Sequence, residues 1–198
     1  MQTVAGVNER ATSVRHTWIL DGAIVFAGSL LMAACAHVSI PLWFTPVPIT
    51  LQTFGVMLLA LTLGGWRASA SLVLYLLEGI SGLPVFSPHG PGGVAQVLGP
   101  TGGFLMSYPF AALACGLVAH RWWQKSRLAA FSAGAIVCSI IIFAFGALRL
   151  AAISHQAAGV ILGAAILPFL PGEVLKAAAA ISIALMKTKG ITWLRSVR

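Results

Sequence analysis

The sequence predicts an all-α integral membrane protein, a compact bundle of six transmembrane helices with both termini in the cytoplasm. Hydrophobic residues occupy 59% of the 198 positions and charged residues only 8%, whereas soluble domains average about 25% charged residues. A chain of this length cannot hide so much apolar surface in a water-soluble core. The basic residues behind the net charge of +8 stand at the ends of apolar segments, which indicates membrane topology rather than nucleic-acid binding.

Six apolar segments have about the length of a membrane-spanning helix, which is roughly 20 residues. They cover residues 18–37, 50–65, 68–83, 103–120, 128–150 and 160–187. The run Gly64-Gly65-Trp66-Arg67 at the junction of the second and third segments predicts a tight turn there. The whole chain, residues 1–198, is therefore predicted to be a single transmembrane domain, with a cytoplasmic tail at 1–17 and a basic tail at 188–198.

The positions of Lys and Arg support this count of helices. Basic residues precede the first segment and follow the second, fourth and sixth, while the loops 38–49, 84–102 and 151–159 contain none. The positive-inside rule then places both termini in the cytoplasm. Five tryptophans fall near the predicted inner boundary, namely Trp18, Trp66, Trp122, Trp123 and Trp193, while Trp43 falls on the outer side.

The beginning of the chain allows a second interpretation. Arg10 and Arg15 precede an apolar run that ends at Cys35, an arrangement similar to a lipoprotein-type signal peptide. We expect the first helix to be retained, because the remainder of the chain is itself too apolar for secretion.

The two longer outer loops are rich in proline and glycine, yet they are apolar. Three prolines within residues 39–48 predict a stiff first loop. The segment 83–103 combines several glycines with prolines, which allows close backbone approach. We interpret this second loop as a lid over a binding site; the alternative is a loop that only packs on the bundle.

The strongest sign of a binding site is a pair of opposite charges inside the sixth segment. Glu173 and Lys176 are three residues apart, so one helical face presents both. Each ionisable residue at membrane depth costs about 2.5–3.5 kcal/mol on insertion scales. Pro171 precedes Glu173 and predicts a helix break or restart, which would place the acid in a first turn. We interpret the pair as a ligand site; the alternative is an ion pair that only holds the helix.

Other polar residues in the apolar segments are weaker candidates. Arg149 ends the fifth segment on the outer side and either supplies a second cation or reaches the lipid headgroups. Tyr75 and Gln52 are candidate hydrogen-bonding residues of the third and second segments. Glu78 is expected near the outer interface, and Asp21 as a partner of the first helix's dipole.

Small residues in the first segment predict close helix packing. Ala23 and Ala27 are four residues apart, and further alanines follow at positions 33, 34 and 36. This spacing lets membrane helices approach closely. The contact is either within the bundle or with a partner membrane protein.

The sequence gives little support to an enzyme. It contains no P-loop, GxSxG or HExxH pattern. The histidines have no metal-ligand spacing, so we expect neither a metal nor a cofactor. Separate apolar runs contain the three cysteines, Cys35, Cys115 and Cys138, which are expected to be buried apolar residues.

Several sequence blocks resemble the BioY family, the biotin-specific S components of energy-coupling factor (ECF) transporters. The similarity covers nearly all of residues 20–185 and is specific because the blocks occur together in this order. The matching blocks are Ile40-Pro41, Pro46-Val-Pro-Ile-Thr-Leu-Gln-Thr53, Tyr75-Leu-Leu-Glu-Gly79, Gly82-Leu-Pro-Val-Phe86, Gly99-Pro-Thr-Gly-Gly103 and Leu167-Pro-Phe-Leu-Pro-Gly-Glu-Val-Leu-Lys176.

The resemblance implies a six-helix S-component fold, and a substrate-binding domain that captures biotin from the outside beneath the outer loops. It also implies uptake energised by a partner ECF transmembrane subunit and ATPase subunits, in the bacterial cytoplasmic (inner) membrane. Self-association into a homo-oligomer remains open. The family's acidic residue and lysine fall on Glu173 and Lys176.

Biotin's chemistry suits the residues that the resemblance marks. Lys176 is expected to bind the carboxylate, and Glu173 to accept hydrogen bonds from the ureido N–H groups. Either Tyr75 or Gln52 would donate to the ureido carbonyl. The expected apolar walls are Trp43, Phe86 and Val85.

Three positions depart from the family pattern. Glu173 stands where the family commonly has Asp, and Arg149 where a Trp is often seen. His89 lies in a loop where some members have an Arg that contacts the ligand carboxylate. We hypothesise that Arg149 partly replaces that cation. An S component for another vitamin and a membrane assembly protein without a small ligand are the alternatives.

Overall fold

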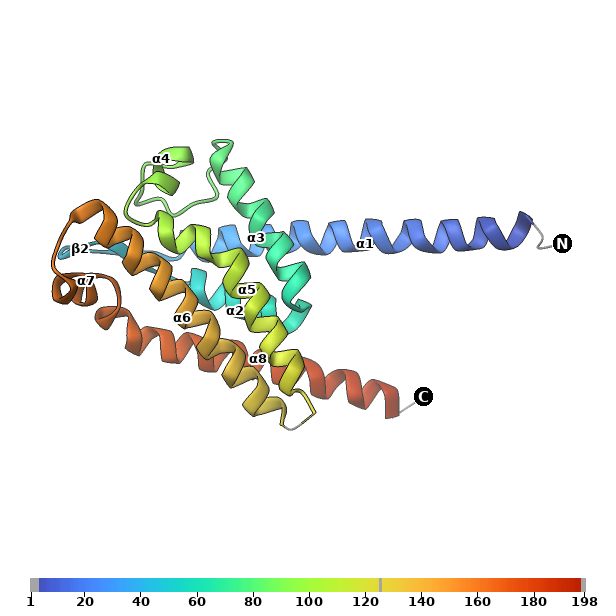
Figure 1. The fold of residues 1–198 in the computed structure, drawn as a ribbon. Helices are drawn as coiled ribbons and strands as arrows, with labels where there is room; N and C mark the ends of the chain where they lie inside the picture. Colours follow the sequence, from blue (N-terminus) through green and yellow to red (C-terminus); the bar gives the residue numbers. More distant parts are fainter. Residues whose placement is uncertain (1–3, 125, 197–198) are drawn as a thin grey trace.

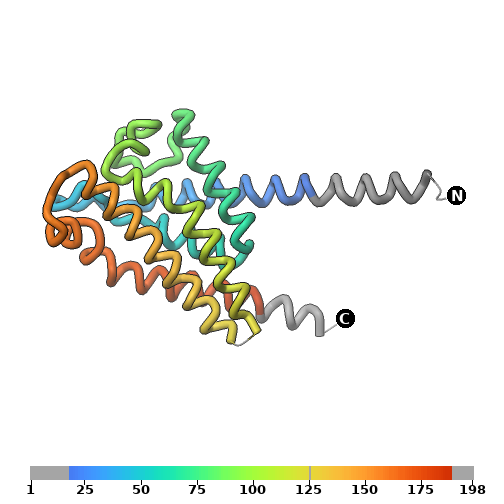
Figure 2. The backbone as a smooth tube through the Cα atoms, viewed as in Figure 1, coloured from blue at the N-terminus to red at the C-terminus, as the bar shows by residue number. Residues whose placement is uncertain are grey.

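The structure is a computed structural model that describes residues 4–124 and 126–196, with side chains between Trp18 and Thr188 except Lys125. The described chain is a helical bundle with a short β-hairpin (Figure 1). The coloured ends of α1 and α8 lie on one side of the bundle, and the hairpin and α7 lie on the other (Figure 2). In chain order the elements are α1 (Val4–His37), β1 (Ser39–Leu42), β2 (Thr45–Thr50), α2 (Gln52–Leu63), α3 (Gly65–Ile80), α4 (Gly93–Leu98), α5 (Gly102–Trp122), α6 (Arg127–Ser154), α7 (Ala158–Ala165), η1 (Leu167–Phe169) and α8 (Leu170–Ser196).

Four helical stretches are long and apolar enough to cross a membrane, namely 18–37, 102–122, 127–154 and 158–188. The two predicted helices between the first and second of these exist as α2 and α3: α2 is shorter than the predicted segment 50–65, and α3 has the predicted length but begins three residues earlier than 68. With 12 and 16 residues, they rise about 18 and 24 Å at 1.5 Å per residue.

Helix α1 packs along α3 through small and polar side chains. Gly28 of α1 lies so close to Ser71 of α3 that a Cβ on Gly28 would be 2.4 Å from the Ser71 hydroxyl oxygen. Arg67 pairs with Asp21 at 2.7 Å, and Ser29 donates a hydrogen bond to Glu78. The predicted dipole role of Asp21 thus gives way to an ion pair between helices.

A tight turn at Gly64 and Gly65 joins α2 to α3, and this turn packs against α5. Gly64 has φ of 86°, a left-handed value that favours glycine, so the predicted tight turn is present. The backbones then nearly touch: a Cβ on Gly116 would lie 2.2 Å from the nitrogen of Gly65. Such an approach is possible only between glycines.

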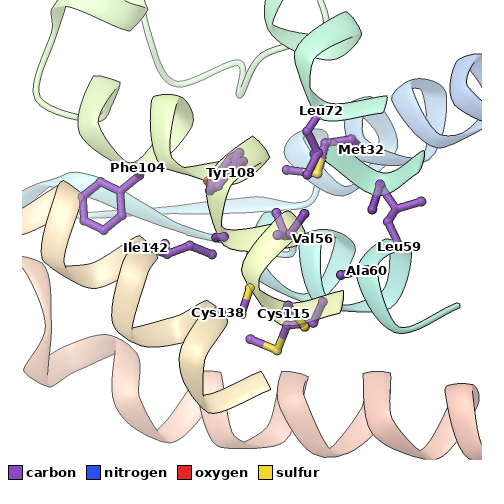
Figure 3. Packing of buried hydrophobic residues seen from close by; sticks show 14 of the residues in the cluster. Met32, Val56, Leu59, Ala60, Leu72, Phe104, Tyr108, Cys115, Cys138 and Ile142 are labelled. Carbon is purple, nitrogen blue, oxygen red and sulfur yellow. The ribbon is translucent and has the colours of Figure 1, made fainter. Parts of the chain in front are cut away.

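Helix α5 is the centre of the bundle, packed against α3 on one side and α6 on the other. Its residues Phe104, Tyr108 and Cys115 lie in one buried cluster with Val56 of α2 and Ile142 of α6 (Figure 3). All three cysteines are buried and free, as the sequence predicts for apolar filling.

The two loops predicted to be on the outer side contain two elements that the sequence analysis missed. The first loop is a hairpin in which Ser39 faces Thr50 and Ile40 faces Ile49, with an irregularity at Pro41. The second loop, residues 81–101, contains the short helix α4; we call this segment the lid. The lid lies at the end of the bundle that also holds the hairpin (Figure 1).

The sixth predicted segment is divided. Helix α7 ends at Ala165, η1 contains Pro168, and α8 begins at Leu170 with Pro171 in its first turn. The predicted restart is present. It places Glu173 in the first turn of α8, where the helix dipole favours an anion.

Candidate functional site

A small cavity lies beneath the hairpin and the lid. Its walls come from the hairpin, α2, the lid, α5, α6, η1 and α8, with Glu173 and Lys176 of α8 among them. The volume is about 50 Å³, small beside the roughly 300–1,000 Å³ of ordinary ligand pockets. The other lining residues are Val47, Pro48, Thr50, Gln52, Thr53, Ser87, Gln96, Thr101, Phe104, Leu105, Tyr108, Phe143 and Phe169.

Glu173 is held by two hydroxyl groups from other helices. Glu173 is 5% exposed. Thr53 of α2 donates to one carboxylate oxygen at 2.6 Å, and Ser139 of α6 donates to the other at 2.8 Å. Both oxygens therefore have a donor, and the carboxylate has a fixed orientation before any ligand arrives.

Lys176 lies beside this carboxylate, but its contacts are longer than those of Glu173. Its Nζ is 3.9 Å from the nearer oxygen of Glu173 and donates to the Thr53 hydroxyl at 3.3 Å. The side chain is 12% exposed. Thr53 thus links the two charges, and the ammonium retains donors for an acceptor placed in the cavity.

A buried hydrogen-bond chain supports the hairpin side of the cavity. The Thr50 hydroxyl donates to the Gln52 side-chain oxygen at 3.1 Å, and the Gln52 amide nitrogen donates to the Tyr75 hydroxyl at 2.9 Å. Tyr75 is fully buried and meets the edge of the Phe86 ring at 5.4 Å between centroids. Gln52 faces the cavity, while Tyr75 and Phe86 lie behind it.

The lid contributes two buried polar side chains. Gln96 of α4 accepts a hydrogen bond from the backbone of Gly92 at 3.1 Å. Ser87 is 5% exposed, and its hydroxyl has no hydrogen-bond partner among the residues that the structure describes. A buried hydroxyl without a partner is unfavourable by about 1–3 kcal/mol. Because Ser87 lines the cavity, a ligand atom there would remove that penalty.

The structure brings together Glu173, Lys176 and Gln52 from the predicted site, with Tyr75 and Phe86 directly behind. Four other predicted residues, Val85, Trp43, His89 and Arg149, lie outside the cavity lining. Trp43 is 95% exposed at the hairpin turn; His89 approaches the Ser39 carbonyl at 3.4 Å; Arg149 donates to the Leu98 carbonyl. Their contact with a ligand stays a prediction.

Sequence reasoning missed Thr53, Ser139 and Ser87 as site residues. Ser139 is a polar residue in an otherwise apolar run, and such residues usually face a polar partner in the bundle. That signal was available. Thr53 and Ser87 had no comparable signal, since their role depends on α8 and the lid meeting them in space.

The chemistry of the cavity lining suits a small molecule that carries hydrogen-bonding groups on an apolar frame. It offers a carboxylate, an ammonium, amides and hydroxyls, set among phenylalanine and leucine side chains. Among the described residues, no group of three His, Cys, Asp or Glu side chains could hold a metal ion.

Comparison with known proteins places the chain among transport proteins. The model of the BioY family matches residues 8–192. The "Biotin transporter BioY" of Thermotoga maritima is 35% identical over 159 residues, covering 80% of this chain and 90% of that protein. The protein of the same description from Rhodobacter capsulatus is 37% identical over 157 residues, covering 75% and 82%.

A solved structure has the same fold. The S component for biotin from an ECF-type ABC transporter superposes with a TM-score of 0.79 at 24% sequence identity. The match covers 88% of this chain and 93% of that one.

Proposed function

The chain belongs to the BioY family, and from this premise we propose that it is the biotin-binding membrane subunit of a vitamin uptake system and not an enzyme. The observation that carries the proposal is the buried Glu173–Lys176 pair, set in the wall of a small cavity beneath two outer loops. An ion pair at membrane depth costs free energy to bury. Here its two members face a cavity that a ligand can fill.

We assign Lys176 to the biotin carboxylate and Glu173 to the ureido N–H groups, with Gln52 and Ser87 as further hydrogen-bonding residues. Since Glu173 and Lys176 lie 3.9 Å apart, the geometry permits a second arrangement. In it both residues contact the ureido group, Glu173 accepting from N–H and Lys176 donating to C=O. A neutral biotin amide separates the two arrangements, as described in the Discussion.

The cavity volume of about 50 Å³ is too small for the bicyclic ring and tail of biotin. Binding therefore requires the hairpin, the lid or nearby side chains to move outward. We infer that the lid opens to admit biotin from the outer side and closes over it, as many binding loops do.

We propose six membrane crossings, with both termini in the cytoplasm of a bacterial inner membrane. Support comes from the basic residues at one side of the predicted segments and from their absence in the loops 38–49, 84–102 and 151–159. The short helices α2 and α3 would form the second and third crossings, with the hairpin and the lid completing the outer side.

We propose that α1 docks a partner ECF transmembrane subunit, which in turn engages the ATPase subunits. Ala23 and Ala27 are exposed, whereas Gly28 and Ser29, on the neighbouring face, are buried against α3. The small-residue stripe therefore points away from this chain's own bundle, where another membrane helix can approach closely.

Replacing Ala27 with Trp tests this face. The bulky side chain is expected to reduce biotin uptake in cells at least tenfold while leaving biotin binding by the purified chain unchanged, because only the docking contact is blocked. Leu148→Trp, at an exposed position of α6, is the control. Equal uptake by Ala27→Trp and wild type would show that this face is free of the partner.

Calorimetric titration of the purified chain with biotin is the direct test of the function. One biotin per chain with micromolar or tighter affinity is expected, with no heat from riboflavin, thiamine or lipoate. Binding of one of those vitamins and not of biotin would assign a different substrate to the chain. The absence of any ligand binding by folded protein would favour a membrane assembly role.

Replacing Thr53 with Val tests the link between the two charges. The variant removes the donor to Glu173 and the acceptor for Lys176, so biotin affinity is expected to fall about tenfold. Thr62→Val is a matched control on the same helix, since the Thr62 hydroxyl donates to the Leu58 carbonyl within that helix and Thr62 lies outside the cavity lining. Similar losses in both variants would mean that the effect comes from α2 and not from the site.

A further inference from the structure

Arg149 connects the outer end of α6 to the lid. Its guanidinium donates a hydrogen bond to the backbone carbonyl of Leu98, the last residue of α4. The last carbonyls of a helix have no intrahelical partner and carry partial negative charge, so a cation is favourable there. The contact joins residues 51 positions apart in the chain.

Helix α4 has an inner side that belongs to the cavity. Gln96 is buried and lines it, while Val94 and Leu98 are exposed. The position of α4 therefore decides whether the cavity is closed on this side. Arg149 acts on the outer end of the same short helix without lining the cavity itself.

The chain passes from the lid into α5 directly beside Arg149. A Cβ on Gly103, the second residue of α5, would lie 2.4 Å from the Cβ of Arg149 and 2.3 Å from the Phe145 carbonyl oxygen. This close approach fixes where the lid rejoins the bundle. It brings the guanidinium within reach of α4, so the hydrogen bond depends on packing that is already in place.

We propose that Arg149 is a positioning residue that holds the lid closed from outside the cavity. The inference rests on the proposed biotin site and differs from the hypothesis that Arg149 binds the ligand carboxylate. A residue that holds the lid slows escape of any ligand in the cavity, whatever its charge. A residue that pairs with the carboxylate discriminates between biotin and a neutral biotin amide.

The experiment compares Arg149→Met with wild type, using stopped-flow binding of biotin and of biotinamide. Dissociation is expected to speed up on the order of tenfold for both ligands, because a charge-assisted hydrogen bond that favours the closed lid is lost. Arg149→Lys should recover part of the slow dissociation, since it keeps a cation. Leu148→Ala, at the exposed neighbouring position, should behave as wild type.

Hydrogen exchange of the ligand-free protein gives a second readout. In Arg149→Met, the amides of Gln96 and Gly99, which bond within the lid to Gly92 and Gln96, should exchange faster than in wild type. This measurement tests the lid even if wild type fails to bind biotin, in which case the proposed function fails and the exchange rates decide the role of Arg149.

Two results would overturn the inference. A loss confined to biotin, with unchanged amide exchange in the lid, would assign Arg149 to the ligand carboxylate. Unchanged dissociation and unchanged exchange in a folded Arg149→Met protein would show that the hydrogen bond to Leu98 contributes nothing to closure.

Discussion

Replacing Lys176 with Met is expected to weaken biotin binding by about 100-fold or more, since truncating one partner of a buried charge pair typically costs about 2–5 kcal/mol. Lys176 lines the cavity and is the cation beside Glu173. The variant removes the donor proposed for the ligand and leaves the Glu173 carboxylate with only its two hydroxyl donors. Calorimetric titration measures the change.

The control for this variant is Lys187→Met on the same helix. Lys187 donates to the Thr62 carbonyl at 2.9 Å, where it caps the end of α2 and lies outside the cavity lining. Biotin affinity should stay within about twofold of wild type, because no ligand contact is removed. Wild-type affinity in Lys176→Met would contradict the proposed site.

A double variant separates binding from folding. Glu173→Gln combined with Lys176→Met removes both charges and leaves no unpaired buried ion, so it is expected to fold as well as wild type and still fail to bind biotin. Titration of Lys176→Met with biotinamide then assigns the contact. A smaller loss for the amide than for biotin places Lys176 on the carboxylate, and equal losses place it on the ureido group.

Replacing Gly116 with Ala is expected to destabilise the bundle by about 2–3 kcal/mol through overpacking. The new methyl group would meet the backbone of Gly65 at 2.2 Å from its nitrogen and 2.4 Å from its Cα. Backbone atoms at a helix corner cannot move aside as a flexible side chain does. Thermal unfolding in detergent measures the change.

Gly22→Ala is the matched control, because Gly22 also lies within a helix and a Cβ there meets nothing within 4 Å. Its stability should be equal to wild type or slightly higher, since Ala favours the helix over Gly. An unfolding midpoint of Gly116→Ala that equals that of Gly22→Ala would show that α5 and the α2–α3 corner can separate without loss.

The sequence predicted the long helices well because length and hydropathy are local properties. Segments 103–120 and 128–150 agree with α5 and α6 to within a few residues. Segment 18–37 agrees with the apolar span Trp18–His37, but α1 itself begins earlier, at Val4. The hairpin was not predicted, since Pro41, Pro46 and Pro48 lack the N–H that a strand ladder uses. Its position is instead fixed by contacts such as that of Thr45, whose hydroxyl donates to the Ala164 carbonyl of α7 at 2.7 Å.

In the candidate site, too, some features follow from local sequence and others depend on contacts between distant parts of the chain. Charges in an apolar segment identified Glu173 and Lys176 without any knowledge of the fold, because burying them needs a reason. Thr53 and Ser139 could not be assigned to Glu173 in the same way. Hydroxyl residues are common in membrane helices, and only the packing of α8 beside α2 and α6 shows which of them face the carboxylate.

The hydrogen bond between Thr53 and Glu173 spans 120 positions of the chain, which has a consequence for synthesis. When the ribosome makes α8, α2 has already been complete for the time needed to add more than a hundred residues. Glu173 must then enter the bilayer and find Thr53 and Ser139 on helices that arrived earlier, and until it does so its charge lacks these partners. Biogenesis of this chain is therefore expected to have a late, slow docking step, with α8 retained by the insertion machinery until the bundle receives it.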